Sequence, residues 1–220
     1  MGTFSPVSLT HNLGVALRFV DMFSRRVVEV PLKVTVDALR WQAFRSESDG
    51  TYRFVATNRP VPAGNFVVTV TDSSGIYSSR EQLQVTLPVV IGHPPPLVRA
   101  DYLVDVPLWP TPGFRSAQGE TVVRGRVVSA GANVASALRV FLFPPPGPRP
   151  AQPYAWPDEN GDFLFRIPGL RGSMSGNVPV TTATLDAEVL DAANNPVVPV
   201  NPANLVVRLG QTEYFVFNAP

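Results

Sequence analysis

The chain has 220 residues, of which 45% are hydrophobic and 16% are charged. Its 18 basic and 17 acidic residues give a net charge of +1 without any run of like charges, which argues against nucleic acid or an anionic membrane surface as a partner. Cysteine is absent, so disulfides and thiolate metal sites are excluded. The apolar content is enough for packed cores and argues against a disordered chain.

The start of the chain bears on where the protein is found. Residues 1–19 contain no basic region followed by an unbroken apolar stretch, and no later window is long and apolar enough to span a bilayer. We therefore expect a protein that is cytoplasmic or part of a particle assembled in the cytoplasm.

Short segments rich in Val, Leu, Phe, Thr and Tyr lie between the 24 prolines and 16 glycines, and their period-two alternation is typical of β-strands. The first half of the chain predicts strands over 32–36, 52–54, 66–70 and 82–87. The second half predicts strands over 121–128, 138–143, 162–167, 182–190, 205–209 and 213–217. Only residues 36–45 approach helical spacing, and because that segment is short and uncapped we expect a turn or a strand there.

One motif occurs twice. The stretch ESDGTYRF contains the turn pair Asp49-Gly50, and DENGDFLF contains Asn160-Gly161, 111 residues later (161 minus 50) and therefore half a chain away. Glycine takes a positive φ without steric cost, and Asp or Asn beside it can hydrogen-bond its own backbone. Each copy therefore predicts a hairpin joint that places the aromatic residues after it in a core, and the repeat predicts two domains built on one plan.

We expect an all-β protein made of two tandem antiparallel β-sandwich domains, residues 1–88 and 98–220, joined by a Pro-rich spacer at 89–97. The segment 102–112 is apolar and aromatic but is interrupted by prolines. We expect it to be an edge strand of the second domain, and a segment buried between the domains is the alternative.

The order of these elements resembles the carboxypeptidase regulatory-like or transthyretin-like β-sandwich, in which a turn D-x-x-G-x-F-x-F precedes a strand P-x-G-x-Y-x-L-x-V. The first half matches this pattern at Asp49, Gly50, Tyr52, Phe54, Pro62, Gly64, Phe66, Val68 and Val70. The second half matches at Asn160, Gly161, Phe163, Phe165, Pro168 and Gly169, and through Gly125 and Val127 as the opening G-x-V, and departs after Gly169. The resemblance implies an immunoglobulin-like fold, which hosts many functions. Cysteine-free chains with such domains are also similar to accessory proteins of phage-tail-like contractile injection systems, which implies a structural role.

Residues that could carry chemistry are few. His11 and His93 lie in expected loops without a ligand set or a nucleophile nearby, so we predict no catalytic residue, no cofactor and no metal site. The stretch Asp158 to Asp162 has oxygen ligands at alternate positions, as a calcium loop does, but lacks the rest of that pattern. An acidic hairpin turn is the favoured interpretation.

Three aromatic residues among prolines, Trp109, Tyr154 and Trp156, are the candidate interaction residues. They could bind a protein partner or stack on a sugar, and the alternative is that they fill space beneath long loops. We predict a non-enzymatic structural module that binds protein subunits of a larger assembly, with a second copy of this chain as one option. A carbohydrate-binding or adhesive module is the alternative.

Overall fold

The computed structural model describes residues 11–36, 43–57, 64–79, 83–87, 103–129, 137–145, 147–167, 173–175, 178–197 and 204–219. Within these segments the chain forms β-strands and no α-helix, which confirms the predicted all-β class. Across the same residues, no helix has the length and apolar character that crossing a membrane requires.

The chain divides into two units. Unit 1 comprises Met1–Val20, Arg26–Ser73 and Glu81–Leu108, and unit 2 comprises Asp21–Arg25, Ser74–Arg80 and Trp109–Pro220. Two short segments from the first half of the chain therefore belong to unit 2. The predicted spacer, residues 89–97, lies outside the described residues, so the predicted domain boundaries stay a prediction.

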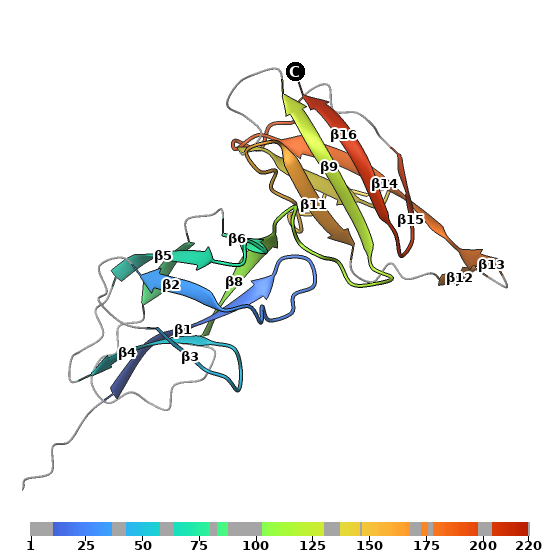
Figure 1. Cartoon of the computed structure of the whole chain (residues 1–220). Helices are drawn as coiled ribbons and strands as arrows, with labels where there is room; N and C mark the ends of the chain where they lie inside the picture. The colour runs from blue at the N-terminus through green and yellow to red at the C-terminus, as the bar shows by residue number, and fades with distance from the viewer. Residues whose placement is uncertain are drawn as a thin grey trace, which may run out of the picture. The chain divides into compact units, whose positions relative to one another are not determined.

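Unit 1 is built from two sheets (Figure 1). One has the strand order β2-β5-β7, and in the other β3, β4, β1 and β8 are neighbours in that order. The strands are β1 (His11–Asp21), β2 (Leu32–Val36), β3 (Ala43–Arg45), β4 (Tyr52–Thr57), β5 (Gly64–Asp72), β7 (Leu83–Leu87) and β8 (Leu103–Pro110). The last residue of β1 and the last two of β8 belong to unit 2, as does β6 (Tyr77–Ser78), which pairs with the end of β8.

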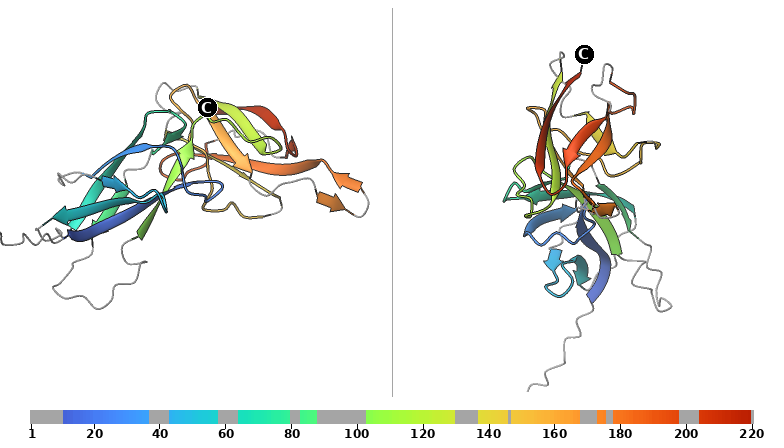
Figure 2. Two further views of the ribbon diagram at one scale, coloured as in Figure 1. Left: turned by 60° about the horizontal axis from the view of Figure 1, so that its bottom comes forward. Right: turned by 90° about the vertical axis from the view of Figure 1, so that its right-hand side faces the viewer.

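Unit 2 contains two three-stranded sheets with the orders β10-β14-β15 and β11-β9-β16, and a small hairpin of β12 and β13. Their bounds are β9 (Thr121–Ser129), β10 (Arg139–Phe143), β11 (Asp162–Ile167), β12 (Ser173–Ser175), β13 (Val178–Val180), β14 (Thr182–Leu190), β15 (Leu205–Arg208) and β16 (Thr212–Ala219). The predicted antiparallel arrangement does not hold for β16, which runs parallel to β9 (Figures 1 and 2). The chain leaves β15 in one sheet and joins the other sheet as β16, so it arrives beside β9 in the same direction.

The two units share one strand plan. When strands are matched in chain order, the sheet β2-β5-β7 corresponds to β10-β14-β15, and β4-β1-β8 corresponds to β11-β9-β16. The repeated turn motif precedes β4 in one unit and β11 in the other, at equivalent places in this plan. The repeat in the sequence thus reflects a repeat in topology.

The strand β8 corrects one expectation. The segment 102–112 was predicted to be an edge strand of the second domain, but β8 lies between β1 and β6, and its residues up to Leu108 belong to unit 1. Val106 and Leu108 are 2% and 1% exposed, so one face of this strand is buried despite its prolines. By topology β8 is the counterpart of β16, the last strand of the shared plan.

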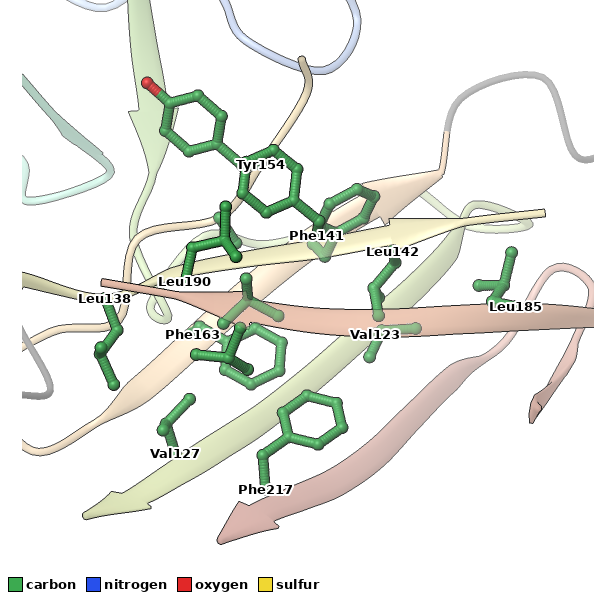
Figure 3. Close-up of a cluster of buried hydrophobic side chains, with 14 of the residues drawn as sticks. Val123, Val127, Leu138, Phe141, Leu142, Tyr154, Phe163, Leu185, Leu190 and Phe217 are labelled. Carbon is green, nitrogen blue, oxygen red and sulfur yellow. The ribbon is translucent and has the colours of Figure 1, made fainter. Parts of the chain in front are cut away.

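The core of unit 2 lies between its two sheets (Figure 3). Phe163 of β11 and Phe217 of β16 stack with ring centroids 5.6 Å apart, and both are 1% exposed. They face Leu185 and Leu190 of β14 and neighbouring side chains of β10. The predicted inward direction of Phe163 and Phe165 is confirmed.

The core of unit 1 uses the aromatic residues that follow the first turn. Tyr52 and Phe54 are 5% and 0% exposed, and the Tyr52 hydroxyl accepts a 2.8 Å hydrogen bond from the backbone N–H of Leu32. Phe19 meets the Tyr52 ring edge-on at 5.3 Å. Leu32, Val34 and Val36 alternate with exposed residues, as predicted.

Both turns adopt the predicted conformation, with φ of 64° at Gly50 and 83° at Gly161. In the first turn, the Asp49 carboxylate accepts hydrogen bonds from the backbone N–H and hydroxyl of Thr51, and it pairs with Arg53 at 2.9 Å. The Thr51 hydroxyl, with help from the Ser46 side chain, holds the pKa of Asp49 well below its usual range.

We predict that Gly125→Ala destabilises unit 2 by about 1–3 kcal/mol, because overpacking a filled site costs that much. A Cβ on Gly125 would collide with the carbonyl oxygen of Phe215 and lie 2.6 Å from the Phe163 ring. The measurement is urea unfolding of the purified protein. Gly113→Ala, where a Cβ would meet only the Thr111 hydroxyl at 3.7 Å, should leave the midpoint nearly unchanged, and equal effects of the two variants would contradict this account.

We predict that Asp49→Asn lowers the free energy of unfolding at pH 7 by about 1 kcal/mol, the typical net value of a lost hydrogen bond. Folding lowers the pKa of Asp49. The contribution of this carboxylate to the free energy of unfolding is therefore present above the unfolded pKa of about 4, and it is lost as the pH falls toward the folded pKa. The difference between Asp49→Asn and the parent protein should therefore narrow in acid. Glu47→Gln, an exposed carboxylate of the same turn, is the control and should show little pH-dependent difference.

Candidate functional site

The segment that carries two of the candidate aromatics runs along the edge of β10. Val140 and Ala155 exchange backbone hydrogen bonds of 2.9 and 2.8 Å, as in an antiparallel bridge. Because side chains alternate along an extended chain, Tyr154 and Trp156 lie on the same side of it. Phe141, on the neighbouring strand, contacts the Tyr154 ring at a centroid distance of 5.3 Å.

The structure brings the three candidate aromatics together. Trp109 lies 5.5 Å from Tyr154 and 6.3 Å from Trp156 between ring centroids, and Tyr154 lies 5.8 Å from Trp156. The Trp109 indole N–H donates a 3.0 Å hydrogen bond to the carbonyl oxygen of Tyr154. Residues 45 positions apart in the sequence thus form one cluster.

The three rings differ in exposure. Trp109 and Tyr154 are 3% and 4% exposed and belong to the core of unit 2, so they fill space beneath the loops. In Figure 3 the Tyr154 hydroxyl points away from the other labelled core side chains. Trp156 is partly exposed and is the aromatic of this cluster that offers surface.

A hollow of about 190 Å³ opens beside the cluster, lined by Ser78, Trp109, Pro110, Thr111, Pro112, Trp156 and Asp158. One of its walls comes from the first half of the chain, because Ser78 of β6 pairs with Trp109 at the end of β8. Thr111 fixes this wall through its backbone N–H, which donates to the carbonyl of Ile76 at 2.8 Å. The Thr111 hydroxyl adds a 2.6 Å hydrogen bond to the carbonyl of Gly75.

Asp158, which also lines the hollow, begins the second copy of the turn motif. Asp158 Oδ1 accepts hydrogen bonds from the backbone N–H groups of Asn160 and Asp162, at 2.8 and 2.9 Å. Arg126 binds the Asp162 carboxylate with two hydrogen bonds of 2.7 and 2.8 Å and holds its pKa below the ordinary value. These contacts correspond to an acidic hairpin turn, the favoured interpretation of this stretch. Within the described residues, no three His, Cys, Asp or Glu side chains are grouped to hold a metal ion.

A charged network lies nearby in unit 2. The Asp21 carboxylate is 2% exposed and accepts hydrogen bonds from the backbone N–H groups of Phe23 and Ser24, at 3.0 and 2.7 Å. Its other oxygen accepts hydrogen bonds from Arg166 at 2.6 Å and from the Tyr77 hydroxyl at 3.0 Å. The network therefore joins both first-half segments of unit 2 to strand β11.

Arg166 is held on several sides. Its guanidinium also pairs with Glu120 at 2.6 Å and lies 4.6 Å from the centre of the Phe114 ring, and its side chain is only 13% exposed. A contact between apolar side chains accompanies this ion pair, because Phe23 packs edge-on against Phe165 with ring centroids 4.8 Å apart. Such a buried arrangement is stable only when every charge has its partners.

Sequence reasoning did not identify Asp21, Glu120 and Arg166. Asp21 and Arg166 are charged residues in apolar segments, Glu120 lies in the polar stretch before β9, and the partners are up to 145 positions apart. For Asp21 and Arg166, the sequence showed only a charged residue inside an otherwise apolar strand. Such a residue does not indicate which distant residue it pairs with. Of the two histidines, His11 begins β1 and His93 lies outside the described residues.

Comparison with known proteins places the chain in no family. No family model and no curated protein matches it. Among solved structures, it is similar to the Bacillus anthracis TIE protein, with 10% identity and a TM-score of 0.27 over 94% of this chain and 34% of that one. It is also similar to the Streptococcal ancillary pilin, with 14% identity and a TM-score of 0.26 over 96% of this chain and 62% of that one.

A further similar structure is GBS52, the minor pilin of Streptococcus agalactiae, with 10% identity and a TM-score of 0.26 over 94% of this chain and 96% of that one. The chain thus spans about a third of the TIE protein and less than two thirds of the ancillary pilin. TM-scores this low do not establish a shared fold, so the function is argued from the geometry of the chain itself.

We predict that Arg166→Met destabilises the protein by about 3–5 kcal/mol, because it leaves the buried Asp21 carboxylate without its cation. Thermal or urea unfolding measures the loss. Arg18→Met removes a bidentate pair with Asp105 whose side chains are 34% and 49% exposed, and this control should cost about 1 kcal/mol or less. A similar loss of stability in both variants would show that the buried network stabilises the protein no more than the exposed Arg18–Asp105 pair does.

Proposed function

We propose that this protein is a non-enzymatic structural module that binds other protein subunits within a larger assembly. The observation that carries the proposal is strand β16, which forms the edge of the sheet β11-β9-β16 over the eight residues Thr212–Ala219. An edge strand presents unpaired backbone donors and acceptors, to which an extended segment of a partner can add as a further strand.

The outward face of β16 carries two exposed apolar side chains. Tyr214 and Val216 are 59% and 47% exposed, and their neighbours in the parallel register are Arg124 and Arg126 of β9. Val128 of β9, opposite Asn218, is 45% exposed and continues the same face. Exposed aromatic and branched side chains along an edge are typical of interaction surfaces.

The edge of β10 provides a contrast within unit 2. The backbone of Val140 is bridged by Ala155, so the chain itself covers that edge at this point. The chain supplies no such cover for β16 in the part that the structure describes. We infer that the β16 edge is where a partner docks.

A structural role also agrees with how the carboxylates of unit 2 are used. Asp21 and Glu120 are paired with Arg166, and Asp162 is paired with Arg126. Carboxylates committed to guanidinium partners stabilise the fold and are poorly placed for general acid or base chemistry.

The carbohydrate-binding alternative now depends on Trp156, because Trp109 and Tyr154 are buried. The comparisons give no support to a contractile injection particle or to the carboxypeptidase regulatory-like family, so the proposal names neither.

We predict that the protein, expressed with its genomic neighbours, elutes in a complex far larger than its own 23.8 kDa. The measurement is size-exclusion chromatography with light scattering and negative-stain microscopy. The double variant Tyr214→Lys and Val216→Lys should shift the protein to the monomer position, because charges on the edge strand oppose strand addition.

The control is Val206→Lys on β15, a valine that is 57% exposed in the other sheet of unit 2. It should leave the complex intact. A monomer with no co-eluting partner in the parent protein would overturn the proposal, and circular dichroism of each variant shows that the fold is kept.

A further inference from the structure

We propose that the hollow beside Trp156 binds a cationic side chain, the ammonium of a lysine or the guanidinium of an arginine, from the protein partner. This inference rests on the proposed function and adds to it a second contact with a defined chemistry. It is carried by three features of the hollow: two indole rings, a carboxylate oxygen without a hydrogen-bond partner among the described residues, and a lining in which the one charged residue, Asp158, is acidic.

The indole rings make up the aromatic walls. The planes of Trp109 and Trp156 are inclined at 84° and their centroids lie 6.3 Å apart, so the rings form a corner. A cation is attracted to an indole within about 6 Å of its centroid, and a group in this corner can come within that range of both rings. The N–H groups of both rings are occupied elsewhere or covered, because that of Trp109 donates to Tyr154 and that of Trp156 is buried.

The carboxylate is that of Asp158. Its Oδ1 accepts the two backbone hydrogen bonds of the turn, which fix the side chain against the hollow. Its Oδ2 has no hydrogen-bond partner among the described residues. A cationic donor at this oxygen would form a charge-assisted hydrogen bond, which is about twice as strong as a neutral one.

The charge around the turn favours a cation. Asp158, Glu159 and Asp162 place three carboxylates within five residues, and Asp162 and Asp158 raise the pKa of Arg126. Arg126 gives both of its hydrogen bonds to Asp162. The charge that lines the hollow is therefore that of the Asp158 carboxylate, although the whole chain has a net charge of +1.

The remaining walls suit the stem of a long basic side chain. Pro110 and Pro112 contribute apolar surface, and Lys and Arg bury their methylene groups against such surface while the charged end makes polar contacts. An anion would meet Asp158, and a neutral apolar group would leave its Oδ2 unsatisfied. A basic side chain can both contact the two indole rings and donate a hydrogen bond to the Asp158 carboxylate.

The test uses the full-length protein labelled with ¹⁵N at its tryptophan side chains, whose three indole signals are assigned with single Trp→Phe variants. The probes are Nα-acetyl-arginine amide and Nα-acetyl-lysine amide, and the neutral control is Nα-acetyl-citrulline amide, which has nearly the shape of the arginine probe. We expect the signals of Trp109 and Trp156 to shift saturably with a cationic probe and not with citrulline. The stronger of the two cationic probes identifies the partner's side chain.

Asp158→Asn keeps the Oδ1 acceptor of the turn while removing the charge, and it should weaken probe binding roughly tenfold. Glu159→Gln removes a charge next to the hollow without changing its lining and should weaken binding about twofold or less. Equal loss in both variants, equal binding of citrulline, or no shift with either cation would overturn the inference. These outcomes are independent of the native mass of the complex, so a failed pocket leaves the assembly proposal standing, and the reverse also holds.

Discussion

The structure of unit 2 depends on the carboxylate of Asp21. A buried carboxylate is costly unless hydrogen bonds and an opposite charge compensate it, and this one, at 2% exposure, has both. One oxygen fixes the turn through the backbone of Phe23 and Ser24, and the other binds Arg166 and Tyr77. Because these partners come from three distant parts of the chain, the arrangement forms only when all of them meet. The Asp21 side chain thus ties two segments of the first half to strand β11 in unit 2.

The same interaction positions the candidate site. Tyr77, held by Asp21, begins the short strand β6, and the next residue, Ser78, pairs with Trp109 and lines the hollow. Asp158, another residue that lines the hollow, belongs to the second turn motif and is held by backbone hydrogen bonds. Hydrogen bonds therefore hold both of these parts of the lining in place. In the sheet β11-β9-β16, strand β9 separates the β16 edge from β11, which carries Arg166. The two proposed contacts can therefore be tested separately.

Alternation of apolar and polar residues was enough to predict most strands. It succeeded for β2, where Leu32, Val34 and Val36 face the core in turn, because one side of that strand is exposed. It missed β1, where the residues from Gly14 to Val20 are buried with little interruption, since a strand covered on both faces has no period of two. It also misplaced β8, because prolines suggested an edge while Val106 and Leu108 are buried. The repeated turn, in contrast, correctly indicated a repeated plan, since positive φ at Gly50 and Gly161 is a local requirement.

The sequence by itself determined the all-β class, the two glycine turns, the inward aromatic residues after them and the identity of three aromatics worth examining. These features follow from local conformational preference and from hydrophobic periodicity, which each segment carries alone. Only the tertiary structure decided that Trp109 and Tyr154 are buried while Trp156 borders a hollow, that β16 is a parallel edge strand, and that Asp21 pairs with Arg166. Those facts depend on contacts between residues far apart in the chain, and the energy of such a contact is not a property of either residue alone.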